Sequence, residues 1–387
     1  MTRPTLRTAF CDRVGVEYPI VLAGMGPVAG TGDPVATADL VAAVSNAGGL
    51  GIIGGVAYSP DRLREEIRKV RSLTDKPFGV DLLLSENFLV PRGDGPLPSL
   101  PPPDRLPQEH RDTVARIAKA LDIDLAQAPR DPSPMGSWIP KGKSWAGCQI
   151  EVLLEEEVPV FASGLGTPGP FKEVLKAHGV TILSLVGTVR AAAQVAADGA
   201  DYVVAQGTEA GGHTGRIGTL ALLPQVMDAV APTPVISAGG IASGRALAAV
   251  IAGGAEAGWC GTAFLVSEEA NQPELQKQRI LEAAAEDTVV TRLYSGKTMR
   301  NIRNPLIDAW EREGLMGLPM GMQSVLIEDL VFSIRQAGRE DLLMNAAGQT
   351  AGMLTQKRPA AEILHEMASD AAVMLSTGLA ERVTASP

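Results

Sequence analysis

Eight short apolar runs, rich in valine and isoleucine, constrain the fold of this chain more than any other feature. Most of them are followed by a glycine-bearing turn and then an alanine-rich, helix-like segment, which is the alternation of a parallel sheet. The runs are continuously apolar, as expected of strands that are buried on both faces. They lie at residues 19–25, 50–55, 78–84, 158–164, 181–187, 202–207, 234–240 and 257–265. Eight such units predict a closed (β/α)₈ barrel of the TIM type rather than an open doubly wound sheet.

Two regions fall outside this alternation and divide the chain. We expect the barrel to comprise residues 1–87 and 148–272, interrupted after the third strand by a proline-rich insertion over 88–147. The turns that follow barrel strands lie on the active-site face, so the insertion is either a surface excursion or a lid over the site. Residues 273–387 are expected to form a helical C-terminal extension that packs on the barrel. Its apolar faces are compatible with a homodimer.

The net charge and the cysteine content indicate which class of partner and which cellular location to expect. The net charge of −10 argues against nucleic acid and anionic membrane, since both require a positive surface, and favours a small-molecule substrate. Cys11, Cys148 and Cys260 are too scattered for a disulfide framework or a closed metal site, which suggests a reducing, cytoplasmic location and no metal. The N-terminus lacks the apolar stretch of a signal peptide, and the most apolar region, 40–57, is broken by polar residues and glycines. We therefore expect no membrane segment.

Two apparent phosphate-binding motifs stand in the wrong context. Gly49, Gly51 and Gly54 have G-x-G-x-x-G spacing, but a helix precedes them and the strand lies inside them, whereas a dinucleotide fingerprint follows a strand and opens a helix. The segment GSWIPKGKS (136–144) is one residue too long for a phosphate loop. The chain has no H-E-x-x-H, no paired C-x-x-C and no G-x-S-x-G, so zinc hydrolysis and serine acyl transfer lose their usual support.

The stretch AQGTEAGGHTG (205–215), which directly follows a predicted strand, is the most informative about chemistry. Its glycines leave the backbone free to approach a flat ligand closely. His213 stands in this bare loop, whereas His110, His178 and His365 fall in helical patterns and are interpreted as ordinary helix residues. Because flanking glycines cannot pack an imidazole into a core, we expect His213 to project into a cleft and to have a functional role.

Two glycine turns farther along the chain indicate an anion site. Gly239 and Gly240 end the seventh predicted strand, just before a helix whose backbone N–H groups can receive an anion. Gly261 and Thr262 close the eighth strand. Tight helix-to-strand packing would explain either turn alone, but the two together favour a phosphate site, which recurs after strands seven and eight of such barrels.

These motifs together resemble the nitronate monooxygenase family, also called 2-nitropropane dioxygenases. The resemblance is carried, in order, by LAGMG, SNAGGLGIIGG, PFGVDLLL, AQGTEAGGHTG, ISAGGIASG and CGTAFL, and near the C-terminus by AAGQTAGML. It implies an FMN-dependent barrel in which His213 is the catalytic histidine over the flavin. The residues implied at the flavin are Gly24, Met25, Asp81, Gln206, Gly211 and Gly212, and those implied at or near the phosphate are Gly239, Gly240, Trp259, Cys260, Gly261 and Thr262.

The reaction that the resemblance implies is oxidation of alkyl nitronates by O₂ to a carbonyl compound and nitrite. His213 would remove a proton α to the nitro group or stabilise the nitronate, and a base whose pKa lies near neutrality suits that task. Two alternatives stay open. One is an NAD(P)H-dependent FMN reductase acting on an enoyl thioester or a quinone, since relatives with those activities share the G-G-H turn. The other is a non-catalytic binder of FMN or of another phosphate ligand.

One position departs from the family pattern. The third strand usually reads G-V-N in the family, but here it reads Gly79-Val80-Asp81. An ionised aspartate can only accept hydrogen bonds, and its charge would oppose the anionic reduced flavin. We therefore expect Asp81 to lower the flavin potential or to turn away and bind something else.

Overall fold

The computed structural model, which describes residues 4–27, 33–91, 101–129 and 139–384, contains an eight-stranded parallel barrel. The strand order is β1-β9-β8-β6-β5-β4-β3-β2. The ring closes between the first and last strands, because the Leu22 N–H donates to the Leu50 oxygen and the Leu50 N–H donates to the Ile20 oxygen, each at 2.9 Å. The strands are β1 (Ile20–Leu22), β2 (Gly51–Gly54), β3 (Phe78–Leu83), β4 (Val160–Gly164), β5 (Thr181–Val186), β6 (Tyr202–Gln206), β8 (Val235–Ala238) and β9 (Ala257–Cys260). The predicted barrel is confirmed.

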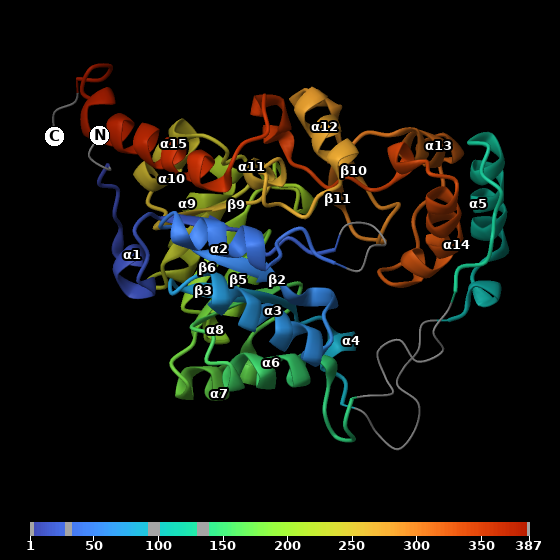
Figure 1. The fold of residues 1–387 in the computed structure, drawn as a ribbon, viewed down its shortest axis with the longest axis horizontal. Helices are drawn as coiled ribbons and strands as arrows, with labels where there is room; N and C mark the ends of the chain where they lie inside the picture. Colours follow the sequence, from blue (N-terminus) through green and yellow to red (C-terminus); the bar gives the residue numbers. More distant parts are fainter. Residues whose placement is uncertain (1–3, 28–32, 92–100, 130–138, 385–387) are drawn as a thin grey trace.

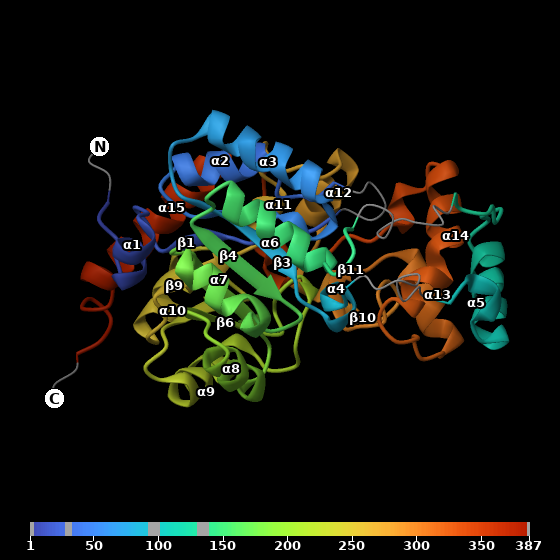
Figure 2. The same ribbon diagram turned by 90° about the horizontal axis from the view of Figure 1, so that it is seen from below.

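Helices surround the barrel (Figures 1 and 2). They are α2 (Ala38–Asn46), α3 (Pro60–Leu73), α4 (Glu86–Leu89), α6 (Trp145–Glu155), α7 (Lys172–Ala177), α8 (Val189–Ala197), α9 (Thr219–Val230), α10 (Gly244–Ala252), α11 (Thr262–Leu265) and α12 (Glu274–Glu282). The C-terminal helix α15 (Ala360–Val373) packs against α10. The helix α1 (Ala9–Val14) contributes Phe10, whose ring meets that of Tyr202 edge-on inside the barrel. No helix of the described residues is both long and apolar enough to cross a membrane.

A smaller lobe with its own core lies at the end of the molecule opposite α1 (Figures 1 and 2). It consists of α5 (Gln108–Ala120), α13 (Pro305–Glu313) and α14 (Met322–Gln336), and its buried side chains include Ile117 and Trp310. The segment after strand three therefore packs with the C-terminal region in a shared core. Two parts of the predicted insertion, 92–100 and 130–138, lie outside the described residues.

An antiparallel hairpin lies within the C-terminal region that the sequence predicts to be helical. Its strands are β10 (Thr288–Thr291) and β11 (Met299–Ile302), and β11 pairs in turn with the short strand β7 (Gly212–His213). The pairing of β11 with β7 cannot be found from local periodicity, because His213 and its partner Met299 lie 86 residues apart in the chain. The hairpin connects the C-terminal region to the histidine loop.

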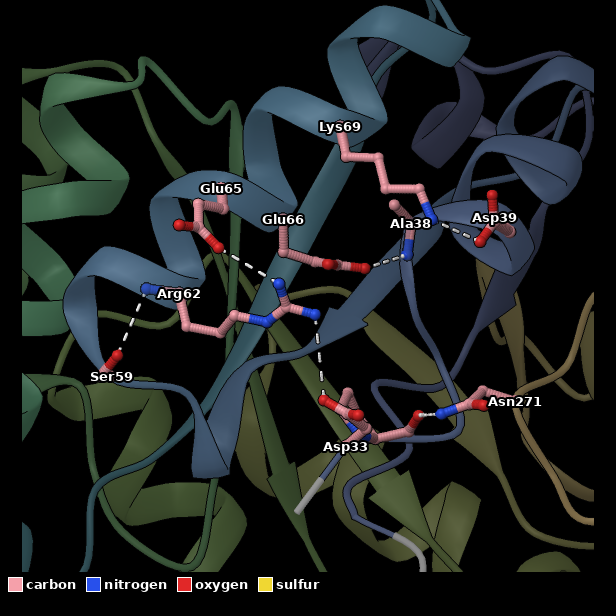
Figure 3. Close-up of polar contacts among 10 residues, drawn as sticks. Asp33, Ala38, Asp39, Ser59, Arg62, Glu65, Glu66, Lys69 and Asn271 are labelled. Carbon is pink, nitrogen blue, oxygen red and sulfur yellow. Dashed lines mark hydrogen bonds and ion pairs between the residues drawn. The ribbon is translucent and has the colours of Figure 1, made fainter. Parts of the chain in front are cut away.

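A cluster of charged side chains ties α2 to α3 (Figure 3). Glu66, which is buried, accepts the backbone N–H of Ala38 at the start of α2 at 2.5 Å. Lys69 pairs with Asp39 at 2.6 Å. The first contact gives a hydrogen-bond acceptor to a backbone N–H at the start of α2, which has no partner within the helix. Both contacts hold α2 against α3, so the cluster has a structural role.

Candidate active site

A cavity of about 1680 Å³ opens where the barrel strands end. Its barrel side is formed by residues that follow the strands, and its other side by 292–299, 316–320 and residues near 344–350. A drug-sized ligand typically occupies a pocket of about 300–1,000 Å³. This cavity therefore has room for a cofactor and a substrate side by side.

The structure gathers nearly all of the predicted site residues around this one cavity. Those that line it are Gly24, Met25, Asp81, Gln206, Gly211, Gly212, His213, Gly239, Gly240, Trp259, Gly261 and Thr262. Cys260 does not line it, because its side chain is buried in the core between the strands and the helices. Successive residues of a strand point to opposite faces, so Trp259 and Cys260 cannot both face inward. Of the predicted binding segment 259–262, three residues thus line the cavity and Cys260 faces the core.

His213 is held in place by the hairpin. As part of β7 it lies opposite Met299 of β11, and the preceding Gly212 has a φ of +68°, which favours glycine. The imidazole Nε2 lies 2.8 Å from the Ser295 Oγ. Burial lowers the pKa of His213 to about 4, and the positive charge of Lys297 contributes. The pKa therefore lies well below the near-neutral value expected from the sequence, and the ring is uncharged at pH 7.

The C-terminal motif AAGQTAGML packs directly against the histidine loop. A Cβ on Gly211 would lie 2.7 Å from the Ala347 carbonyl carbon, and one on Gly348 would lie 2.5 Å from the Glu209 oxygen. The Gly348 N–H donates to the Thr262 Oγ1 at 2.9 Å, and the Gln349 N–H donates to the Glu209 oxygen at 3.0 Å. Segment 346–349 is thus a wedge between the histidine loop and the turn after β9, and only glycine fits its tightest point.

The two predicted anion-binding turns lie on the same cavity. Gly239 and Gly240 follow β8 with φ values of +89° and +77°, a conformation that side chains disfavour. The helix α10 begins just beyond, where the Ser243 hydroxyl accepts the Ala246 N–H at 3.3 Å. Because these turns carry almost no side chains, a ligand can approach their backbone amides closely.

Asp81 lies in the cavity wall beside Gly24. Its side chain is buried, and a Cβ on Gly24 would lie 2.3 Å from the Asp81 Cβ, so only glycine fits there. The Asp81 Oδ1 is buried and has no hydrogen-bond partner among the described residues. Burial raises the pKa of Asp81 to about 8. Burial therefore favours the neutral carboxyl over the ionised carboxylate expected from the sequence.

Sequence reasoning missed the side of the cavity formed by the C-terminal region. Ser295 and Lys297 come from the turn of the β10–β11 hairpin, and Met316 and Met320 come from the loop before α14. The small turn residues in YSGKT (294–298) are a hairpin signal that could have located this segment. Its position next to His213 has no local signature.

A parallel (β/α)₈ barrel with a histidine in a glycine-rich loop and two bare glycine turns on one cavity is the architecture of a flavin-dependent oxidoreductase. The nitronate monooxygenase family model matches residues 7–370. The chain belongs to the nitronate monooxygenase family.

Individual relatives agree with this assignment. A protein of Mycobacterium tuberculosis named "Putative monooxygenase Rv1533" is 37% identical and aligns over 94% of this chain and 96% of its own length. A 5-hydroxy-7a-methyl-1-oxo-octahydro-1H-indene-4-carboxyl-CoA dehydrogenase of Rhodococcus jostii is 34% identical over 81% of this chain and 70% of its own length. The crystal structure of nitroalkane oxidase from Streptomyces ansochromogenes superposes with a TM-score of 0.77 at 30% identity, covering 96% of this chain and all of the other. The protein is thus an FMN-dependent oxidoreductase and not a non-catalytic binder of FMN or of another phosphate ligand.

Proposed function

We propose that this protein oxidises alkyl nitronates, with His213 acting on the substrate beside bound FMN. One observation carries the proposal: the histidine and both glycine turns face the same cavity. A catalytic group and the backbone amides suited to an anionic tail are thereby brought to one site.

The residues around the cavity fit FMN. Gly24, Met25, Gln206, Gly211 and Gly212 would contact the flavin, and the three glycines among them leave a wide surface for a flat ring. The turns at Gly239–Gly240 and Gly261–Thr262 would hold the phosphate. FMN, when bound, supplies the two-electron redox chemistry that no amino-acid side chain provides.

His213 is suited to accept a proton. The Ser295 hydroxyl lies within 3.5 Å of the Lys297 carbonyl oxygen, and when it donates there its oxygen accepts the Nε2–H of His213. This leaves the Nδ1 of His213 as the basic atom, and none of the described residues is a hydrogen-bond partner for it. A substrate anion that forms beside the ring would favour the imidazolium form, so transfer of a proton α to a nitro group is helped by the charge that it creates.

A second candidate is reduction of the C=C bond of an enoyl thioester, or of a quinone, by NAD(P)H through bound FMN. Two observations favour it: the cavity exceeds the needs of a small nitronate, and one relative is named for a carboxyl-CoA substrate. The apolar side formed by Met316 and Met320 would suit a longer acyl chain.

The two candidates are separated by anaerobic titration of the purified flavoprotein. Bleaching of the flavin spectrum by propyl-2-nitronate, followed by nitrite formation with O₂, supports nitronate oxidation. Bleaching by NADH or NADPH without any response to the nitronate overturns it in favour of the reductase. A His213→Ala variant that binds FMN normally should lose turnover of the neutral nitroalkane by at least about 100-fold.

A further inference from the structure

The Asp81 side chain faces the cavity, and its Oδ1 has no hydrogen-bond partner among the described residues. It lies opposite Gly54 of β2 and Ala162 of β4, and its neighbours along the strand, Val80 and Leu82, point into the outer core. Strand alternation therefore turns Asp81 toward the cavity. Gly24 covers one side of it.

No described charged group compensates this carboxyl. The other charged or titratable residues that line the same cavity are Glu209, His213, Arg292, Tyr294 and Lys297. Glu209 is already bonded to the Thr219 amide and hydroxyl, at 3.0 and 2.9 Å. Burial is the one cause that raises the pKa of Asp81, so none of these charges contributes.

A carboxylate that is buried without a partner is costly, and the side chain avoids that cost by keeping its proton. A neutral carboxyl has one O–H donor and keeps acceptor capacity, which is the hydrogen-bonding pattern of an asparagine amide. The donor needs an acceptor. Gly24, Gly54 and Ala162 offer no polar side chain, and the Asp81 Oδ1 has no hydrogen-bond partner among the described residues, so we assign the acceptor to the molecule in the cavity.

We propose that Asp81 is a protonated carboxyl group that donates a hydrogen bond to the bound flavin and makes both FMN affinity and the flavin reduction potential depend on pH. The inference rests on the proposed function only in that FMN is the ligand. It reverses the expectation from the sequence, because a neutral donor stabilises the anionic reduced flavin, whereas a carboxylate would oppose it. At a pH where Asp81 keeps its proton, the flavin reduction potential is raised. At a higher pH, where Asp81 is ionised, the flavin reduction potential falls.

The first experiment uses the FMN-free protein and does not depend on flavin chemistry. Infrared spectra between pH 5 and 10 should show a protonated-carboxyl C=O band that disappears near pH 8 and is missing in Asp81→Asn. Asp75→Asn, which removes an exposed carboxylate, should keep the band. If the wild-type protein shows no such band at pH 6, the carboxyl is ionised and the proposal is overturned. This result can be read on the wild-type chain even if Asp81→Asn fails to fold.

The second experiment measures FMN binding by fluorescence quenching and the reduction potential by dye equilibration across the same pH range. When only the protonated carboxyl binds, the dissociation constant rises about tenfold for each pH unit above the pKa. With the pKa of Asp81 at about 8, the wild-type constant should thus rise about fivefold between pH 8 and 9 relative to Asp81→Asn, whose amide does not titrate. Equal pH dependence of the two proteins, with the infrared band present, would show a neutral Asp81 that does not touch the flavin and would overturn the proposal. Failure to oxidise nitronates would leave both readouts intact and would count against the proposed function alone.

Discussion

Gly348→Ala tests whether the C-terminal wedge holds the histidine loop. The added Cβ would lie 2.5 Å from the Glu209 carbonyl oxygen and 2.9 Å from the Gly211 nitrogen. Both are backbone atoms, which cannot rotate away as the end of a side chain can. The wedge must therefore withdraw, and it then loses its hydrogen bonds to Thr262 and Glu209.

The expected cost follows from these two effects. Overpacking costs about 1–3 kcal/mol, and each lost hydrogen bond costs about 1 kcal/mol. We expect the free energy of unfolding to fall by about 3–5 kcal/mol in urea titrations. FMN should also dissociate more readily, since the displaced loop carries Gly211 and Gly212, which line the cavity. Gly169→Ala is the matched control, because its Cβ would meet its nearest neighbours at 3.5–3.6 Å. It should change stability by less than about 0.5 kcal/mol. If Gly348→Ala is no less stable than this control, the wedge does not hold the loop and the reasoning is refuted.

Three further predictions concern single side chains. Ser295→Ala removes the partner of the His213 Nε2, so kcat/KM for a neutral nitroalkane should fall about tenfold and its pH dependence should shift; an unchanged pH profile from 5 to 9 would contradict this. In the folded protein the pKa of His213 is about 4, below the unfolded value of about 6.5, so the wild type should lose stability as pH falls from 6.5 toward 4. His213→Asn should lose less in urea titrations, and parallel curves would argue against a buried neutral imidazole. Glu66→Ala removes the acceptor of the Ala38 N–H and should cost about 1–3 kcal/mol by thermal and urea unfolding. The exposed neighbour Glu65→Ala should cost less than about 1 kcal/mol, and equal losses would show that the buried cap is not special.

The candidate site could be predicted from the sequence wherever its signals are local. The glycine turns and His213 stand directly after strands, and parallel strands bring such turns to one end of a barrel. The same logic does not place Cys260 at the cavity, because strand alternation turns its side chain into the core while Trp259 faces the cavity. It also misses that burial raises the pKa of Asp81, because no residue pattern reports burial.

The barrel can be predicted from local sequence alone, since eight continuously apolar runs separated by glycine turns and amphipathic helices have few other ways to bury their surfaces. The residues that lie beside the histidine follow from long-range pairing instead. The β10–β11 hairpin reaches β7 across about eighty residues, and α5 joins α13 and α14 across a still longer stretch of chain. Propensity and periodicity act over a few residues, whereas these pairings depend on which buried surfaces meet once the barrel has closed.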